Sequence, residues 1–295
     1  MFFGGGVTLS DILQSNELNI KPIMMKLVED LPNEVGLFLS SGIDSRCILF
    51  ALLEAGKQVH TYSFTLDDRM SRDCEVARQV SNEFGVKFTK VLLPTNIQIL
   101  KDDVLVLHHK YGCTKKTEYE CVWPFLYAYP MVEETVVANG IRADSHFCIS
   151  KRARIHFKDD LDAYRRECFN SPNGGQYLQH LKLAEKCKTS VFAPYRSQEM
   201  IDYFMGTTYE QCNKPHQKQP ILNAFPEQFA RCKVYPHTNF QLGDSGISEH
   251  FNELLKTDWN RCGFKLVTGI FNRVNKGDFV DGRGIKGAEK QLELF

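Results

Sequence analysis

The chain has 295 residues, with 36 lysines and arginines against 36 aspartates and glutamates, so its formal charge is zero. A protein that binds nucleic acid or an anionic membrane mainly through its overall charge would carry a positive excess, and this class is excluded. Hydrophobic residues make up 43% and charged residues 24%, a composition that excludes a disordered chain and allows one large domain or two ordinary ones.

Targeting signals and cysteine spacing indicate the compartment. No apolar run reaches the roughly 18 residues of a membrane span, and the N-terminus lacks a basic region followed by an apolar run. Ten cysteines are scattered along the chain, and no two have the Cys-x-x-Cys spacing of common zinc and redox sites. We therefore expect a cytoplasmic protein with reduced thiols, without a signal peptide or a membrane segment.

The first half of the chain alternates strand-like and helix-like segments. Short apolar runs predict strands at Val35–Ser40, Val59–Phe64, Val86–Leu93 and Glu134–Asn139. Helical spacing predicts helices at Asp44–Ala55, Ser71–Phe84, Asn96–His108 and Cys121–Met131. Alternation of this kind forms βαβ units, so it predicts an α/β fold with a doubly wound parallel sheet at about 20–150, after an N-terminal extension over 1–20.

The second half of the chain has a different character. Charged segments predict helices at Lys158–Cys168 and Gln176–Lys188, separated by an Asn-, Pro- and Gly-rich loop at Asn170–Gly175. Because strand-like runs are few, we predict a helical lobe over 151–255 that packs on the sheet and completes the active site. A basic, Gly-rich tail follows over 256–295.

The stretch Leu37–Ser45 carries the clearest chemical signal. A predicted strand ends there, a turn of small residues (Ser40, Ser41 and Gly42) follows, and then a helix begins. Such a turn places backbone N–H groups and the positive end of a helix at the carboxyl edge of the sheet, where phosphate binds. A carboxylate beside a phosphate is repulsive unless a cation lies between them, so Asp44 indicates a phosphate site with Mg²⁺.

The motif Ser40-Ser-Gly-Ile-Asp-Ser45 resembles the pyrophosphate loop, Ser-Gly-Gly-x-Asp-Ser, of the N-type ATP pyrophosphatases, or PP-loop enzymes. This family, with its adenine nucleotide alpha hydrolase-like fold, includes asparagine synthetase, beta-lactam synthetase and tRNA-thiolating enzymes. Its members cleave ATP between the α and β phosphates, adenylate an oxygen of the substrate, and let a nucleophile displace AMP. The resemblance implies that the loop, with the hydroxyls of Ser40 and Ser45, binds pyrophosphate. Ser41 replaces the first glycine of the motif, at little cost if φ there is negative.

Four later segments resemble the asparagine synthetase branch of the family, in the same order. They are Val137–Phe147 (a strand before Gly-Glu-Gly-Ala-Asp-Glu-Leu-Phe in the branch), Ala193–Asp202 (Pro-Phe-Leu-Asp and a helix), Lys218–Ala224 (Lys-x-x-Leu-Arg-x-Ala) and Pro226–Lys233 (Pro…Arg-x-Lys). Together with the loop, they indicate an asparagine synthetase-like synthetase domain over about residues 20–250.

The resemblance implies roles for single residues. Asp44 and Asp144 correspond to the carboxylates that hold Mg²⁺ on the ATP phosphates. Lys233 corresponds to the catalytic lysine at the reacting carboxylate and phosphate. Lys218 and Arg231 are further cations that would reach phosphate. Arg231 is expected to be a catalytic residue, and Lys218 an ATP-binding one. The remaining ATP contacts that it implies are Gly140 and the backbone around Leu39, Ser63 and Phe64, which would hold adenine.

The sequence departs from the branch on the acceptor side. The Gly-Glu-Gly of the branch has become Gly140-Ile141-Arg142, and its next Glu has become Ser145. The first of these Glu residues helps to organise the substrate amine in asparagine synthetase, so aspartate is not the expected acceptor. Residues 1–39 are too few for the family's glutaminase domain. The expected nitrogen donor is then free ammonia, a substrate amine, or ammonia from a separate glutaminase.

Three hypotheses stay open at this point. The first is an AMP-forming ligase that adenylates a small-molecule carboxylate and forms an amide C–N bond, with ATP and Mg²⁺. The second is an enzyme that modifies a nucleotide, a tRNA or a DNA base by the same adenylation. A local basic patch would serve it, formed by Arg152, Arg154, Arg165 and Arg166. The third is a degenerate nucleotide-binding protein without activity, because Ile141 and Ser145 replace acidic residues.

Overall fold

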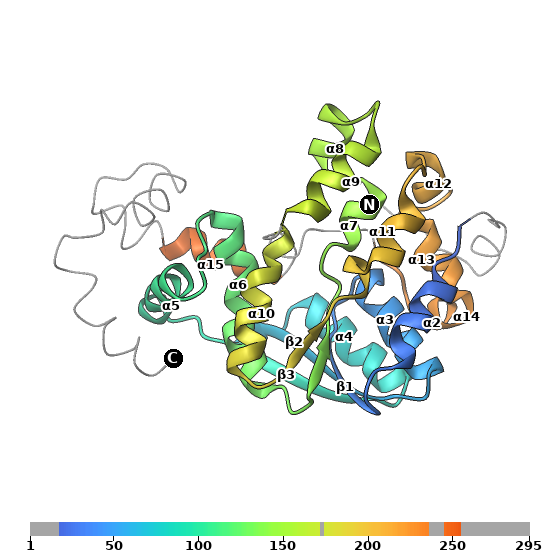
Figure 1. Ribbon diagram of the computed structural model, residues 1–295. Coiled ribbons are helices and arrows are strands. Elements are labelled where there is room, and N and C mark those ends of the chain that lie inside the picture. The colour runs from blue at the N-terminus through green and yellow to red at the C-terminus, as the bar shows by residue number, and fades with distance from the viewer. Residues whose placement is uncertain (1–17, 172–173, 236–244, 255–295) are drawn as a thin grey trace, which may run out of the picture.

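A five-stranded, all-parallel sheet forms the centre of the computed structural model, which describes residues 18–171, 174–235 and 245–254 (Figure 1). The strands lie in the order β3-β2-β1-β4-β5, and every neighbouring pair is parallel. They are β1 (Glu34–Phe38), β2 (Gln58–Leu66), β3 (Lys87–Leu93), β4 (Val136–Ala138) and β5 (Ser190–Phe192). The predicted doubly wound parallel α/β sheet is confirmed.

Helices account for most of the remaining described chain. They are α2 (Lys21–Glu29), α3 (Ile43–Glu54), α4 (Arg72–Glu83), α5 (Ile97–His109), α6 (Lys116–Ala128), α7 (Ala143–Phe147), α8 (Lys151–His156), α9 (Leu161–Asn170), α10 (Tyr177–Lys186), α11 (Gln198–Phe204), α12 (Tyr209–Asn213), α13 (Gln219–Ala224), α14 (Pro226–Ala230) and α15 (Ile247–Leu254). Three 3₁₀ turns join them: η1 (Tyr129–Met131), η2 (Gly174–Gln176) and η3 (Pro194–Arg196).

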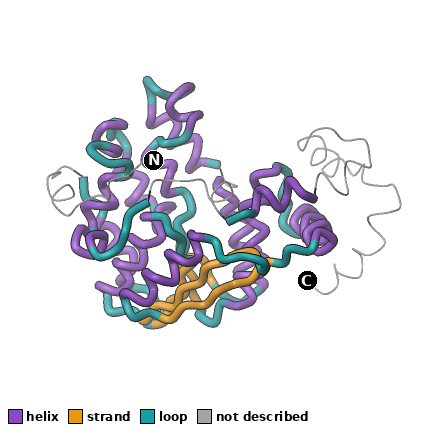
Figure 2. Tube along the Cα trace, turned by 180° about the vertical axis from the view of Figure 1, so that it is seen from behind, coloured by secondary structure: helices purple, strands orange, loops and turns teal. Residues whose placement is uncertain are grey.

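Two hydrophobic cores lie on the two faces of the sheet. Along β1, Val35 and Leu37 point into the first core and Phe38 points into the second, as the two-residue period of a strand requires. Helices α2, α3, α4, α11, α13 and α14 close the first core, and α5, α6, α10 and α15 close the second. Seen from behind, the strands lie side by side low in the molecule, with helices to either side (Figure 2). Burial on both faces explains why the central strands β1 and β2 read as apolar runs.

Local signals in the sequence set the helix boundaries in the first half. Ser71 is the N-cap of α4 and its side chain accepts a hydrogen bond from the backbone of Cys74. Asn96 caps α5 in the same way through Gln98 and Ile99. Each predicted strand and helix of this half is present, with ends that differ by a few residues.

The second half of the chain is mainly helical, and it also contributes to the sheet and to its cores. Strand β5 extends the sheet beyond the predicted boundary at about 150, and α15 packs against α5 and α6 in the second core. Only α8 and α9, which project above the sheet in Figure 1, have a small core of their own. Strand β5 was missed because three residues are too short for a period to be read.

Several predictions concern other parts of the chain. The N-terminal extension up to residue 17 and the basic tail from residue 255 lie outside the described residues. Within the described ranges, nine cysteines are free thiols, and no helix is long and apolar enough to cross a membrane.

Candidate active site

The candidate site lies where the strand order of the sheet reverses. From β1 the chain moves outward through β2 and β3, and it then returns to add β4 and β5 on the other side of β1. The connections that leave β1 and β4 therefore diverge at the carboxyl edge, which is where ligands bind in open α/β sheets. Asp44 follows β1 and Asp144 follows β4, so both predicted metal ligands lie at this switch point.

The loop after β1 is braced by its own side chains. Gly42 is the N-cap of α3, with φ −70° and ψ 148°. The hydroxyl of Ser45 accepts a hydrogen bond from the backbone N–H of Ser40 (3.1 Å), and the Ser40 hydroxyl accepts one from the N–H of Gly42 (3.1 Å). Ser41 is not among the residues with positive φ, so it replaces the family glycine without strain. These contacts hold the loop in one shape beside the start of α3.

A carboxylate already lies against this loop. The backbone N–H of Ser41 donates to Oδ1 of Asp73 at 2.8 Å, and the Ser41 hydroxyl donates to the same oxygen. Asp73 belongs to the first turn of α4, the helix that follows β2. An anion is therefore accommodated where the sequence predicts phosphate, and a phosphate that took this N–H would have to displace Asp73.

Arg46 is a buried cation beneath the loop that sequence reasoning missed. Its guanidinium donates to the carbonyl oxygens of Ser41 (2.5 Å) and Lys233 (2.9 Å), and the side chain is fully buried. Burial lowers the pKa of Arg46, against the effects of nearby groups that raise it. Arg46 thus ties the segment that contains Lys233 to the loop. Its position inside a helix gave no sign of this role.

A buried lysine joins the two predicted metal ligands. The ammonium of Lys218 lies 2.5 Å from Oδ2 of Asp44 and 2.5 Å from Oδ1 of Asp144. The Lys218 side chain is 2% exposed, and its backbone is left-handed, with φ 61°. Burial opposes the charge on Lys218, but the two carboxylates outweigh it and raise its pKa. Both carboxylates therefore face one position that is already occupied by a positive charge.

This donor set fits Mg²⁺. Carboxylate oxygens are the ligands that Mg²⁺ prefers, and Asp44 and Asp144 converge on one cation from two strands. They would hold the ion, which would neutralise charge on the ATP phosphates. The prediction that Lys218 contacts phosphate stays a prediction, because its nearest charged partners in the structure are the two carboxylates.

The β1 and β4 connections also touch each other directly. A Cβ built on Gly140 would lie 3.4 Å from Cβ of Asp44, so a small residue there permits the close approach. The hydroxyl of Tyr195 donates to the backbone oxygen of Asp44 (3.1 Å), and Nε2 of His146 lies 2.6 Å from the Tyr195 carbonyl. Burial lowers the pKa of His146 to about 3, which keeps the ring neutral, with its proton on Nε2. Tyr195 and His146 were not predicted, although both lie inside predicted motifs.

Lys233 and Arg231 lie on the outer side of the loop. The Lys233 carbonyl accepts from Arg46, but its exposed ammonium lies 5.2 Å from the centre of the Tyr235 ring. Arg231 donates to Oε1 of Glu83 at 3.0 and 2.8 Å, at the far end of α4 from Asp73. The structure thus brings the backbone of Lys233 to the loop and does not bring Arg231 there, and both catalytic assignments stay predictions.

The predicted adenine contacts lie on β1 and β2. Leu39 is buried and its N–H donates to the carbonyl of Tyr62. Ser63 and Phe64 are also buried, and β2 continues past them to Leu66, so they lie inside the strand rather than at its end. Phe64 packs edge-on against Phe125 in the second core. The contact of adenine with this backbone stays a prediction.

Three of the four arginines of the predicted basic patch pair with carboxylates. Arg165 is fully buried and pairs with Asp162 at 2.6 Å, while Arg152 pairs with Glu167. Arg166 pairs with Asp160 in the same region. Nearby carboxylates thus offset three of these arginines, whereas Arg154 is exposed and lines a pocket, so the basic patch stays a prediction.

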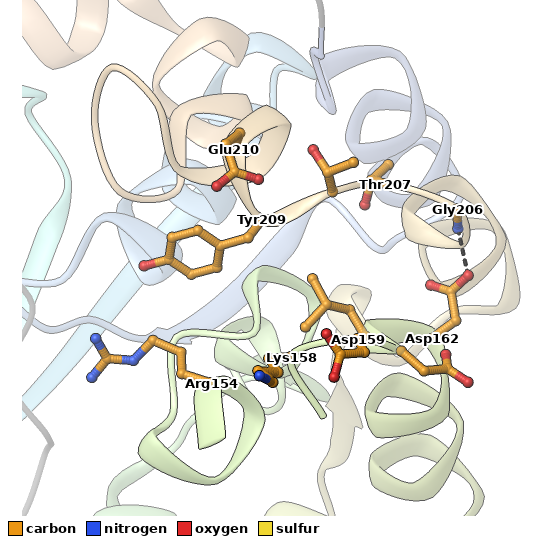
Figure 3. A pocket seen from close by; sticks show the side chains of 11 residues that line it. Arg154, Lys158, Asp159, Asp162, Gly206, Thr207, Tyr209 and Glu210 are labelled. Atoms are coloured by element: carbon orange, nitrogen blue, oxygen red, sulfur yellow. Dashed lines mark hydrogen bonds between the residues drawn. The ribbon is translucent and has the colours of Figure 1, made fainter. Parts of the chain in front are cut away.

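A pocket of about 560 Å³ lies at the end of α8 and α9, against the segment that leads into α12 (Figure 3). Arg154 and Lys158 line it together with acidic residues, and Gly206 donates to Asp162 at 2.8 Å across its edge. None of the predicted site residues lines this pocket. It is therefore separate from the site at the carboxyl edge.

Comparison with known proteins supports part of the predicted resemblance. Residues 24–110 match the family model for asparagine synthase, a range that begins in α2, contains the loop and ends after α5. The asparagine synthetase-like resemblance is thus confirmed for this range, which includes Asp44 but not Asp144 or Lys218. No curated protein sequence matches the chain.

Two solved structures are similar to the chain at low identity. One is a predicted subunit of a tRNA methyltransferase from Methanocaldococcus jannaschii, at 16% identity and a TM-score of 0.32, covering 68% of this chain and 94% of that one. The other is the U34-tRNA thiolase NcsA from Methanococcus maripaludis with its [4Fe-4S] cluster, at 12% identity and a TM-score of 0.29, covering 97% and 80%. At such TM-scores the superposition is poor, and neither likeness bears on what this chain does.

Proposed function

Because residues 24–110 match the asparagine synthase family, we propose that this chain is an ATP-dependent, AMP-forming ligase that joins a carboxylate to ammonia or an amine. The observation that carries the proposal is the meeting of Asp44, Asp144 and Lys218 beside the Ser40–Ser45 loop. These groups come from three distant parts of the chain and converge at the switch point of the sheet.

The proposed reaction has two steps. In the first, a carboxylate oxygen of the acceptor attacks the α-phosphorus of ATP, the bond from that phosphorus to the bridging oxygen breaks, and pyrophosphate leaves. In the second, the nitrogen of ammonia or an amine attacks the acyl carbon, AMP leaves with the electron pair of the C–O bond, and the nitrogen loses a proton. A separate glutaminase is a further source of the ammonia in this proposal.

The residues of this chain would act mainly by stabilising the negative charge of the phosphates. The N–H groups at the start of α3 and the hydroxyls of Ser40 and Ser45 would hold the departing pyrophosphate. Lys218 places a buried positive charge beside the same position. Asp73 lies on the loop and Lys218 lies between the carboxylates, so both contacts would be exchanged for phosphate and Mg²⁺ when ATP binds with its metal.

The test is the identity of the products. The full chain is incubated with ATP, Mg²⁺ and a set of small carboxylates, with ammonia or with small amines, and AMP, pyrophosphate, ADP and orthophosphate are measured. We expect AMP and pyrophosphate in equal amounts. Release of ADP and orthophosphate, or activity that survives Asp44→Ala, would contradict the proposal. Glu54→Gln, a change in an exposed pair with Lys21, is the matched control.

The other hypotheses have less support from the structure. Nucleic acid modification would use the predicted basic patch, and three of its four arginines (Arg152, Arg165 and Arg166) pair with carboxylates. A degenerate protein without activity predicts that ATP binds and no product forms with any acceptor.

A further inference from the structure

Two arginines lie beside Asp144 on the side away from β1. Arg142 lies in the turn between β4 and α7, and Arg196 ends η3, directly after β5. Because β4 and β5 are neighbours in a parallel sheet, both arginines lie at the carboxyl edge that carries the candidate site. The predicted adenine contacts lie on β1 and β2, so these arginines occupy the opposite end of the same edge.

Both guanidinium groups reach one glycine. Nη1 of Arg196 donates to the carbonyl oxygen of Gly174 at 3.4 Å. A Cβ built on Gly174 would lie 2.2 Å from Nη2 and 2.8 Å from Nε of Arg142, so a side chain at this position would displace Arg142. The positive charges of Arg142 and Arg196 thus both lie near Gly174, which has no side chain.

Neither arginine has an acidic partner among the residues that the structure describes, and Nε of Arg142 is buried without a hydrogen bond there. Nη1 of Arg142 contacts the Ser145 hydroxyl at 3.4 Å, and the Arg196 guanidinium lies 4.3 Å from the centre of the Tyr177 ring. Burial and the neighbouring charge of Arg142 lower the pKa of Arg196, against an opposing effect of Tyr177. By contrast, other arginines pair with carboxylates, namely Arg69, Arg78, Arg152, Arg165, Arg166 and Arg231.

Arg142 is also one of the five described residues other than glycine that have a positive φ. Its φ is 72°, in the left-handed region that residues other than glycine rarely adopt. Such conformations persist where the surrounding structure imposes them, and they cluster at ligand sites. Arg142 lies in the short turn between β4 and Asp144, so the left-handed residue and the predicted metal ligand belong to one segment.

We propose that Arg142 and Arg196 bind an anionic group of the acceptor, a carboxylate or a phosphate, other than the carboxylate that is adenylated. Planar guanidinium groups match both anions, and one anion between two arginines would offset their repulsion. Arg142 is two residues from Asp144, and Tyr195, next to Arg196, donates to the backbone of Asp44. The acceptor is therefore a small acid with a second negative group. Naming the bound molecule as the acceptor rests on the proposed function.

Direct binding tests the site without turnover. Calorimetry measures binding of succinate, phosphoglycolate and inorganic phosphate to the full chain while a non-hydrolysable ATP analogue with Mg²⁺ occupies the loop. We expect saturable binding of at least one probe, weakened at least about tenfold by Arg142→Gln and by Arg196→Gln. The probe that binds shows whether the site prefers a carboxylate or a phosphate. Arg166→Gln, which removes the same charge from an exposed pair, should leave binding unchanged.

Turnover tests the substrate class. Pyrophosphate release is compared for the matched pairs butanoate and succinate, and glycolate and phosphoglycolate. We expect the doubly acidic member of at least one pair to have a kcat/KM at least about tenfold higher, and the glutamine variants to lose this preference. Arg142→Lys and Arg196→Lys keep the charge, so they should retain part of it, and thermal unfolding confirms that each variant folds.

The outcomes separate this inference from the proposed function. If no acid releases pyrophosphate but probe binding depends on both arginines, the ligase proposal fails and the anion site stands. If the wild type and both glutamine variants bind every probe equally, or if Arg166→Gln weakens binding as much, the anion site is wrong whatever the turnover shows.

Discussion

The two edges of the sheet both carry clusters of charged side chains, but they match their charges differently. At the amino edge, Nδ1 of His60 lies 2.8 Å from Oε1 of Glu134, and the Tyr62 hydroxyl donates to Oε2 of the same carboxylate at 2.8 Å. Nε2 of His60 lies 2.8 Å from the hydroxyl of Thr89. The Tyr62 hydroxyl also lies 2.7 Å from Nδ1 of His60, so each of these polar side chains has a partner within the cluster.

At the carboxyl edge, by contrast, groups of like charge lie close to one another. Two carboxylates, Asp44 and Asp144, share the ammonium of Lys218, and two arginines meet at Gly174. Lys218 and Arg142 have left-handed backbones, whereas none of the four amino-edge residues named above does. His60, Glu133 and Glu134 are close enough to hold a metal, yet Lys87 pairs with Glu133 and Tyr62 with Glu134. Clustering alone therefore does not mark a functional site, and crowded like charges on a strained backbone are the better sign.

The largest expected effect is the loss of activity on neutralising a predicted metal ligand. Asp44→Asn and Asp144→Asn should each lower pyrophosphate release at least about 100-fold, because charge on the departing pyrophosphate is no longer neutralised. The double variant should release pyrophosphate about as fast as either single variant, since both carboxylates hold the same cation. Steady-state kinetics with calorimetric binding of Mg²⁺–ATP measures this. Effects of the two variants that multiply would show that the carboxylates act independently.

Removing the shared ammonium should affect stability more than any surface change. Lys218→Met leaves the carboxylates of Asp44 (19% exposed) and Asp144 (48% exposed) without their shared counter-charge, so the free energy of unfolding should fall by about 2 kcal/mol, less than for a fully buried pair because solvent screens Asp144. Mg²⁺ should restore at least half of this loss, because the ion takes the position of the ammonium. Urea unfolding with and without MgCl₂ measures both effects. Lys26→Met, in an exposed pair with Glu199, is the control. A loss that Mg²⁺ does not change would argue against a metal position there.

A smaller effect is expected from the carboxylate on the loop, and it has the opposite sign. Asp73→Asn keeps an oxygen that accepts from Ser41 but removes the charge that competes with phosphate. We expect ATP to bind about tenfold more tightly, measured by calorimetry. Glu75→Gln removes the same charge from the same helix turn and should have no such effect, since Glu75 pairs with exposed Arg78. Weaker ATP binding in Asp73→Asn would mean that Asp73 supports the bound state.

The carboxyl edge was partly predictable because its signals are local. The strand, the small-residue turn and Asp44 follow one another within nine residues of sequence, Leu37–Ser45, and the caps at Ser71 and Asn96 are single residues with a known preference. The position of Lys218 was not predictable, because 174 residues separate it from Asp44 and only the packing of α13 on α3 brings them together.

Other features left no trace in the sequence at all. Arg46 reads as an ordinary helical arginine until its burial beneath the loop is seen. Conversely, Arg165 was assigned to a basic surface patch, and its full burial against Asp162 could not be inferred from composition. The meeting of Arg142 and Arg196 depends on Gly174, which the sequence shows only as part of a loop.

The smallest expected effect belongs to the amino edge, and it tests whether that cluster is structural only. Glu134→Gln keeps acceptor and donor atoms near His60 and Tyr62, so the free energy of unfolding should fall by only about 1 kcal/mol. Pyrophosphate release should equal that of the wild type, and neither Mg²⁺ nor Zn²⁺ should stabilise the wild type more than the variant, as measured by thermal unfolding. A metal-dependent stabilisation that disappears in Glu134→Gln would instead make His60, Glu133 and Glu134 a real ion site. The contrast between the edges would then rest on which ligand each one binds, and no longer on whether it binds one.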